Sequence, residues 1–474
     1  MSDNESNLHR ERYLRRTQKS TPVGFDRTSS TPNSIGGLFR IREDYLFSGF
    51  KVLIPELSVA NINLPKKNPT GELGYPAPPY ICRMNAKVTS LLLILCFTLT
   101  SCPPAPTDTV VTVPTAAAPT APAPAAAPTV NIQAEVKKAP KNIILMIGDG
   151  MGVTQISAGM YSNGNKLNLE QFPVIGLHKS YSSDNLVTDS AAGATAFSAG
   201  VKTYNGAIGV SSDTMPVVTI LELAEAAGLP TGLVANCSIT HATPASFAAH
   251  NRTRKNYEEI ALDIMEAEVD LLIGGGAKFF ERREMDDRNL STELRSRNYA
   301  VESFVNIEMK DVRPSTDKNY FYLTADTEPL PFSQGRDYLV PAAEMAPDFL
   351  EKRDKNNKGF FLMIEASQID WGGHANKSDY IISEMIEFDN AIGKVLDFAK
   401  KDGETLVIVT ADHETGGYAI QYGSKMDSID GAFTSDYHTA DLIPVFAYGP
   451  GAEHFAGIYE NTAIFDKMKE LFGF

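Results

Sequence analysis

Three groups of residues in this chain have the types and the spacing that metal-assisted hydrolysis needs. Ser190 opens a run of small residues, TDSAAGATA, from Thr188 to Ala196. Far downstream lie two pairs of an acid and a histidine, Asp370 and His374 in SQIDWGGHAN and Asp412 and His413 in VIVTADHETGG. Carboxylate and imidazole groups bind Zn²⁺, and metal coordination activates a serine hydroxyl as a nucleophile. The combination predicts a two-metal hydrolase with a serine nucleophile.

Each motif also has a structural explanation when it is taken alone. Asp370 and His374 have the i, i+4 spacing of a solvated helix face, and TDSAAGATA could be an N-capped structural helix. Arg254 alone is an ordinary surface charge. Four of the eight histidines, however, lie at candidate site positions: His241, His374, His413 and His438. This joint occurrence favours the functional explanation, with the start of the Ser190 helix also suited to holding an anion.

The elements that must position these residues follow from the hydrophobic pattern after Lys141. Continuous apolar runs predict strands at Asn142–Gly148, Thr231–Cys237, Leu271–Gly276, Gly359–Glu365, Thr405–Ala411 and Ile443–Gly449. Helical patterns lie between them, among others at Val217–Gly228 and Ile382–Gly403. Continuous hydrophobicity is typical of strands covered on both faces. We therefore expect an α/β fold, a three-layer sandwich with a mainly parallel central sheet.

The candidate chemical groups follow the expected strands. Ligands of such sheets bind at the carboxyl ends of the strands, where this chain has Asp149, His241, Thr243, Glu365, Asp412 and His413. The stretch from about Lys278 to Pro347 has no clear periodicity, and we expect it to be an insertion or a cap over the site.

The first 140 residues predict export rather than a folded domain. Residues 84–102 have a basic flank, an apolar stretch and the ending Leu99-Thr100-Ser101-Cys102, which is typical of a lipoprotein signal peptide; an uncleaved signal anchor is the alternative. Residues 103–140 are rich in Pro, Ala and Thr and predict an extended linker. Residues 1–83 are an extension of uncertain origin, either an overlong start or a cytoplasmic segment. The catalytic domain is expected at 141–474, exported to the periplasm or anchored at the outer membrane.

Composition narrows the class of protein further. The chain has 474 residues, 43% of them hydrophobic, and a net charge of −15, so a nucleic-acid partner is not expected. Three of the four cysteines precede the expected domain, which argues against a disulfide framework. Cys237 is expected to be a small buried hydrophobic side chain without a partner.

Taken together, the motifs resemble those of the alkaline phosphatase family. IGDGMG, the serine motif, HATPASFAAHNRTR, IEASQIDWGGHAN, DHETGG and the late His438 span residues from about 142 to 451. The resemblance implies the family's fold and the hydrolysis of phosphate monoesters through a phosphoserine intermediate. It also implies activity above neutral pH and a possible homodimer, with the membrane contacted only through an N-terminal lipid.

The resemblance also assigns roles to individual residues. Ser190 would be the nucleophile and Arg254 the guanidinium that binds two phosphate oxygens, with Arg252 as the alternative. One zinc would be held by Asp370, His374 and His438. The second zinc would be held by Asp149, Asp412 and His413. A Mg²⁺ ion would be held by Asp149, Thr243 and Glu365.

Two positions that vary within the family carry His241 and Trp371 here. Both are expected to lie beside the substrate. An imidazole near the third ion could admit Zn²⁺ or Co²⁺ in place of Mg²⁺, while Trp371 removes an ammonium group that could reach the phosphate.

Other functions remain open at this stage. A sulfatase would need a C/S-x-P-x-R signature, whereas Ser190 is followed by Ala-Ala-Gly-Ala. A phosphodiesterase of the same superfamily remains an alternative, as does a non-catalytic phosphate- or metal-binding lipoprotein.

Overall fold

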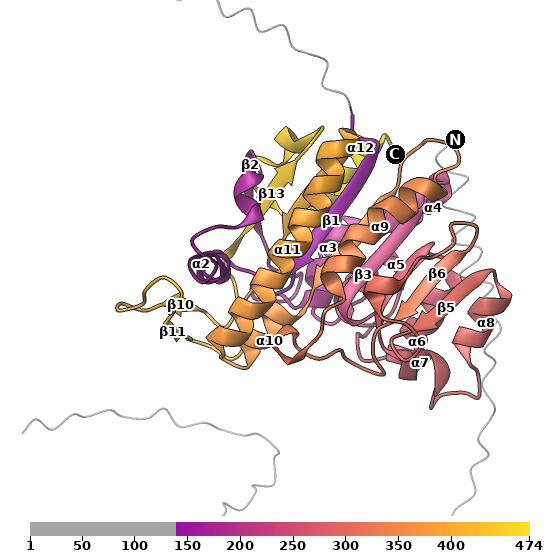
Figure 1. Cartoon of the computed structure of the whole chain (residues 1–474), viewed down its shortest axis with the longest axis horizontal. Helices are drawn as coiled ribbons and strands as arrows, with labels where there is room; N and C mark the ends of the chain where they lie inside the picture. The colour runs from indigo at the N-terminus through magenta and orange to yellow at the C-terminus, as the bar shows by residue number, and fades with distance from the viewer. Residues whose placement is uncertain (1–138) are drawn as a thin grey trace, which may run out of the picture. The chain divides into compact units, whose positions relative to one another are not determined.

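A ten-stranded mixed sheet forms the centre of the computed structural model, which describes residues 139–474 (Figure 1). The strand order is β14-β2-β13-β8-β1-β7-β3-β4-β6-β5. The strands are β1 Asn142–Gly148, β2 Val174–Lys179, β3 Thr231–Ser238, β4 Leu271–Gly275, β5 Tyr299–Ser303, β6 Asn319–Leu323, β7 Phe361–Ala366, β8 Thr405–Thr410, β13 Leu442–Tyr448 and β14 Gly457–Glu460. Neighbours pair in parallel except at β13, which is antiparallel to both β2 and β8. The predicted α/β class and the mainly parallel sheet are therefore confirmed.

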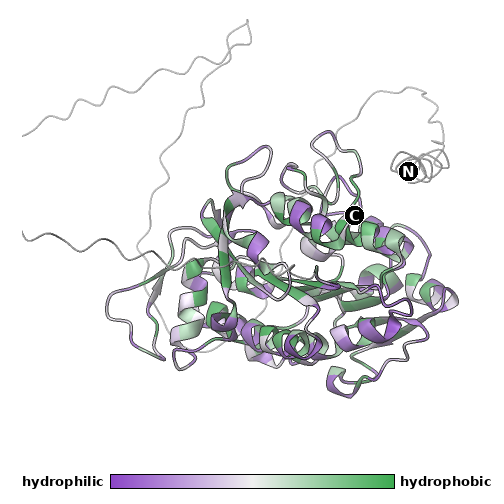
Figure 2. Cartoon of the chain, turned by 90° about the horizontal axis from the view of Figure 1, so that it is seen from above, coloured by the Kyte–Doolittle hydropathy of each residue, from purple (hydrophilic) through white to green (hydrophobic). Residues whose placement is uncertain are grey.

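Helices cover both faces of this sheet, and the side chains of β1 alternate between the two faces. Ile143, Leu145 and Ile147 pack into one core with α3 Ser190–Ala199, α4 Ile220–Ala227, α5 Ala242–Ala248, α6 Tyr257–Glu266, α7 Ala277–Glu281, α8 Leu290–Ser296 and α12 Ala463–Phe472. Ile144 and Met146 pack into the other core with α2 Val153–Tyr161, α9 Leu339–Arg353, α10 Gln368–His374 and α11 Ser378–Asp402. Figure 2 shows the hydrophobic strands between these two layers of helices. Burial on both faces explains why β1 is apolar at every position.

Two pairs of two-residue strands complete the assignment among the described residues. One pair is β9 Glu414–Thr415 with β12 His438–Thr439, and the other is β10 Ala419–Ile420 with β11 Gly431–Ala432. The first pair matters for the site because its antiparallel register places His438 opposite Thr415.

The segment from Lys278 to Pro347 differs from our expectation of an insertion or cap. It supplies β5 and β6, which extend the central sheet beyond β4, and most of α9, which packs against α11. Both strands are only five residues long, so neither forms a run long enough to stand out as a periodic pattern. The segment is part of the sandwich rather than a separate cover.

The predicted signal peptide, linker and extension lie outside the described residues. Within residues 139–474, no helix combines the length and the apolar character that a membrane span requires.

Candidate active site

Four adjacent strands bring most of the candidate residues to one edge of the sheet. The order β8-β1-β7-β3 places the ends of these parallel strands side by side. Asp412 and His413 follow β8, Asp149 follows β1, Glu365 lies near the end of β7, and His241 and Thr243 follow β3. The sequence could place each residue after a strand, and the sheet order shows that the four strands are neighbours.

Ser190 begins helix α3, as the small-residue pattern predicted, and its side chain is almost fully buried. Asp189 is the N-cap, and its Oδ1 atom accepts a hydrogen bond from the Ala192 amide at 3.0 Å. The expected anion site at this helix start is thus partly used by a side chain of the chain itself. Gly193 lets α3 approach the site, because a Cβ atom there would lie 2.9 Å from the Cβ of Asp412.

Asp370, His374 and His438 form a first group of converging ligand atoms. His374 Nδ1 lies 2.7 Å from the carbonyl oxygen of Asp436, and His438 Nδ1 lies 2.8 Å from that of Thr188. Each Nδ1 therefore carries the hydrogen, and the two Nε2 lone pairs face each other at 3.1 Å. Neither Nε2 atom carries a hydrogen, so the two nitrogens cannot form a hydrogen bond with each other. A cation between them could accept both lone pairs. Asp370 Oδ1 lies 3.4 Å and 3.6 Å from these two nitrogens.

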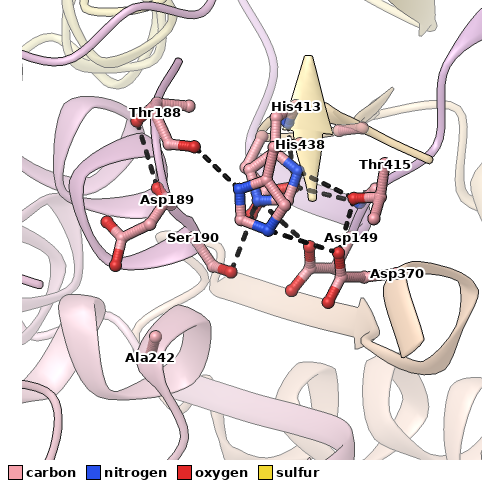
Figure 3. Close-up of polar contacts among 12 residues, drawn as sticks. Asp149, Thr188, Asp189, Ser190, Ala242, Asp370, His413, Thr415 and His438 are labelled. Atoms are coloured by element: carbon pink, nitrogen blue, oxygen red, sulfur yellow. Dashed lines mark hydrogen bonds and ion pairs between the residues drawn. The ribbon is translucent and has the colours of Figure 1, made fainter. Parts of the chain in front are cut away.

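Asp149, Asp412 and His413 form a second group, and all three are fully buried. Figure 3 shows Asp149 and His413 beside Asp370. His413 Nε2 lies 3.5 Å from Asp149 Oδ1 and 3.3 Å from Asp412 Oδ2. The Thr415 hydroxyl donates its hydrogen to Asp370, so its oxygen accepts a hydrogen bond from His413 Nδ1. The lone pair of His413 is therefore on Nε2, which faces the two carboxylates. Both oxygens of Asp149 and one of Asp412 have no hydrogen-bond partner. Buried acceptors that face only other acceptors fit a bound cation.

Burial and mutual repulsion shift the pKa values of these groups. Burial, followed by the charges of Asp412, Asp370 and Glu365, raises the pKa of Asp149 well above its usual value. Burial and the Asp370 charge raise the pKa of Asp412 to about 7. Burial and the two neighbouring histidines lower the pKa of His413 well below its usual value. The chain thus concentrates acidic groups whose ionised form a bound cation would stabilise.

A third group contains Cys237, His241 and Glu365, whose ligand atoms lie within 4.8 Å of one another. Asp149, which we expected to bridge the second and third ions, converges with Asp412 and His413 in the second group, and its bridging role stays a prediction. The Thr243 hydroxyl and Glu365 Oε1 are buried without hydrogen-bond partners. Cys237 is buried and forms no disulfide, as predicted, and its Sγ lies 3.1 Å from Glu365 Oε2.

Arg254 lies between Asp189 and His241. Its Nη1 atom is 3.0 Å from Asp189 Oδ2, and its Nη2 atom is 3.1 Å from His241 Nε2. Arg254 also lines the cavity, whereas Arg252, the alternative we considered, is exposed and does not.

A cavity of about 390 Å³ opens at the first group and Arg254. It is lined by Asp189, Ser190, His241, Arg254, Asp370, Trp371, His374, Tyr437 and His438. Ser190 Oγ lies 3.5 Å from His413 Nε2 at its base, so the hydroxyl stands beside both imidazole and carboxylate groups (Figure 3). Trp371 meets His241 edge to face at 6.2 Å between ring centroids.

Sequence reasoning missed three residues of this site. Asp189 orients Arg254, Thr415 connects Asp370 with His413, and Tyr437 stacks on His438 at 4.3 Å between centroids. Asp189 and Thr415 lie within the motifs TDSAAGATA and DHETGG, and Tyr437 directly precedes His438, so closeness to a motif residue was the available signal.

A three-layer α/β fold with a serine among converging carboxylates and imidazoles at one sheet edge defines a metal-dependent hydrolase. A family model described as alkaline phosphatase matches residues 140–430. Alkaline phosphatase 3 of Bacillus subtilis is 36% identical, over 68% of this chain and 87% of its own length. The solved alkaline phosphatase of the Antarctic bacterium TAB5 is 45% identical with a TM-score of 0.67, covering 71% of this chain and 99% of that one.

The chain therefore belongs to the alkaline phosphatase family. It is a phosphoric monoester hydrolase, and catalysis in this family depends on metal ions. A substituted variant of the TAB5 enzyme, also 45% identical to this chain, has been solved with Mg bound in a site designated M3.

Proposed function

We propose that the cavity beside Ser190 hydrolyses phosphate monoesters in two steps, with Ser190 as the nucleophile. The observation that supports this assignment is the position of the Ser190 hydroxyl. It opens into the cavity, 3.5 Å from His413 of the second group, and the three residues of the first group line the same cavity.

The ligand groups fit two zinc ions and a third ion. Asp370, His374 and His438 would hold one zinc, and Asp149, Asp412 and His413 the other. Glu365 and Thr243 would hold the third ion with Asp149, as Mg²⁺ or, given His241, as Zn²⁺ or Co²⁺. When bound, these ions supply positive charge that acidifies hydroxyl groups and stabilises the phosphoryl oxygens.

The residues of the chain perform the remaining tasks. Arg254 binds two phosphate oxygens through its planar guanidinium, and Trp371 and His241 border the bound substrate. In the first step Ser190 Oγ bonds to phosphorus, its proton passes to solvent, and the bond from phosphorus to the alcohol oxygen breaks as that oxygen gains a proton. In the second step a water oxygen bonds to phosphorus, the Oγ–phosphorus bond breaks, and Ser190 regains a proton as inorganic phosphate leaves.

Replacement of the nucleophile tests this proposal. Ser190→Ala in the fully metal-loaded chain should lower p-nitrophenyl phosphate hydrolysis near pH 9 by about a thousandfold or more while the metal content is retained. The matched control is Ser157→Ala, because the Ser157 hydroxyl bonds only to the backbone of its own helix α2. Full activity in the Ser190 variant would contradict the assignment, and a higher rate on bis-p-nitrophenyl phosphate would favour a diesterase.

Export and anchoring belong to the proposal as well. A lipoprotein signal at 84–102 followed by the 103–140 linker would hold the catalytic domain at a membrane surface on the exported side. The supporting observation is the sequence Leu99-Thr100-Ser101-Cys102 after an apolar stretch. A homodimer is also proposed from the family resemblance, and the oligomeric state in solution tests it.

A further inference from the structure

The end of strand β3 carries a thiol that the proposed reaction does not use. Cys237 is fully buried, and its Sγ atom lies 3.1 Å from Glu365 Oε2 and 3.3 Å from the Ser238 carbonyl oxygen. β3 and β7 are parallel neighbours with Ala235 opposite Glu365, so the thiol and the carboxylate reach the same point from adjacent strands. An apolar role alone does not require a thiol to face a buried carboxylate.

Two further buried groups point to a ligand at this place. Glu365 Oε1 and the Thr243 hydroxyl have no hydrogen-bond partner, although both residues are fully buried. Buried polar atoms without partners are rare and commonly mark an ion or a water. Cys237 and Glu365 have ligand atoms within 4.8 Å of each other, beside His241, and this separation is compatible with a single ion bound to the thiol and the carboxylate.

The hydrogen-bond pattern of His241 makes the thiol the stronger soft donor in this group. Arginine only donates, so His241 Nε2 accepts from Arg254 and Nδ1 carries the hydrogen. A neutral imidazole in this arrangement cannot bind an ion through Nδ1 while Arg254 stays in place. Besides the proposed bridging carboxylate of Asp149, the negative ligands available to an ion are then the Glu365 carboxylate and the Cys237 thiolate.

We propose that Cys237 is a ligand of the third ion, together with Glu365, and that this site therefore takes Zn²⁺ or Co²⁺ in preference to Mg²⁺. Thiolates bind zinc and cobalt well, whereas Mg²⁺ requires oxygen ligands in near-octahedral geometry. As the bond from sulfur to the ion forms, the S–H proton leaves to solvent, and neither partner changes oxidation state. The inference deepens the proposed function and rests on it for the existence of a third ion.

Cobalt substitution tests the ligand directly, without an activity measurement. The full chain, freed of metal, is titrated with Co²⁺ while near-ultraviolet absorption is recorded, because a thiolate bound to Co²⁺ gives an intense charge-transfer band there. The band should appear in the wild-type chain and be lost in Cys237→Ser. A triple variant that replaces the other three cysteines, Cys82, Cys96 and Cys102, should keep it.

Competition between ions supplies the second measurement. In the wild-type chain, a third equivalent of Zn²⁺ should stay bound when excess Mg²⁺ is added. Cys237→Ser should lower the ratio of Zn²⁺ affinity to Mg²⁺ affinity at this site at least tenfold. Cys237→Ala serves as a second variant if the serine variant does not fold. Absence of the band in the triple variant, or an unchanged preference in Cys237→Ser, would overturn the proposal. If the Ser190→Ala variant had still lost hydrolysis in that case, the proposed function would stand and only the Cys237 ligand would be wrong.

Discussion

At the scale of single residues, the position of Arg254 depends on two neighbours with opposite properties. Burial lowers the pKa of the guanidinium, but the charge and hydrogen bond of Asp189 raise it overall, so the group stays cationic. Burial and the Arg254 charge lower the pKa of His241 to about 3, which keeps this imidazole neutral and able to accept from Arg254. Asp189 thus holds one nitrogen of the guanidinium and His241 holds the other, and this guanidinium is the group that we assign to phosphate binding.

Replacing this fork by a point charge should weaken phosphate binding. We expect Arg254→Lys to raise both KM and the inhibition constant of inorganic phosphate about 10- to 100-fold, because an ammonium group cannot bind two oxygens in one plane. Arg252→Lys is the matched control, since Arg252 is exposed and lies outside the cavity. Equal inhibition constants for the two variants would exclude Arg254 as the phosphate ligand.

At the scale of elements, His250 connects the segment after α5 with helix α4. Its Nδ1 atom lies 2.7 Å from the Gly209 carbonyl oxygen and its Nε2 atom 2.9 Å from Glu222 Oε1, so both ring nitrogens face acceptors. Only the imidazolium form donates from both. Burial alone would lower the pKa of His250, but Glu222, the Gly209 carbonyl and the more remote Asp263 raise it to about 9.

This raised pKa predicts how the stability of the enzyme changes with pH. The pKa of His250 is raised from 6.5 to about 9 by folding, so its stabilisation is complete below pH 6.5 and is lost as pH rises through 9. Glu222→Gln removes the charge but can keep the hydrogen bond to the Thr219 amide that caps α4. Between pH 6 and pH 10 the wild-type free energy of unfolding should fall by about 2–3 kcal/mol more than that of the variant. Parallel pH profiles of the two metal-loaded proteins in urea would contradict this expectation.

At the scale of the whole molecule, the metal ions and the fold support each other. Burial raises the pKa of Glu365 to about 7, as it does for Asp412, so these carboxyls resist ionisation unless a cation is near. Ligands that bind only the folded state stabilise it by mass action. The ions are therefore expected to stabilise the sandwich as well as to catalyse the reaction.

Chelation measures this contribution. Removal of the ions should lower the midpoint of thermal unfolding by about 5–10 °C at pH 7. The raised pKa values of Asp149, Asp412 and Glu365 mean that folding keeps these groups protonated, so the stability of the metal-free protein falls as pH rises through those values. The loss should therefore be larger at pH 9 than at pH 7. A midpoint insensitive to the chelator would show that the groups do not hold ions in solution.

The sequence could predict the centre of the fold and most of the site for one physical reason. β1, β3, β7 and β8 are buried on both faces, so their apolar runs stand out, and their polar ends are visible as motifs. β2 and β14 lie at one end of the sheet, and polar residues such as His178 and Glu460 interrupt their apolar runs. The contact between Cys237 and Glu365 depends on β3 and β7 being neighbours in the sheet. The spacing of residues along the sequence does not reveal the order of the strands.

The position of β1 has a consequence for the order in which this protein can fold. Ile143 pairs with Phe361 on one side and with Leu406 on the other. The central strand β1 therefore pairs only with residues that lie more than 200 positions further along the chain. Closing such long loops is slow, and the apolar surface of β1 stays exposed until β7 and β8 arrive. No chain that ends before β8 contains the second group of ligands, so metal uptake and activity should arise together, late in folding, rather than accumulate by stages.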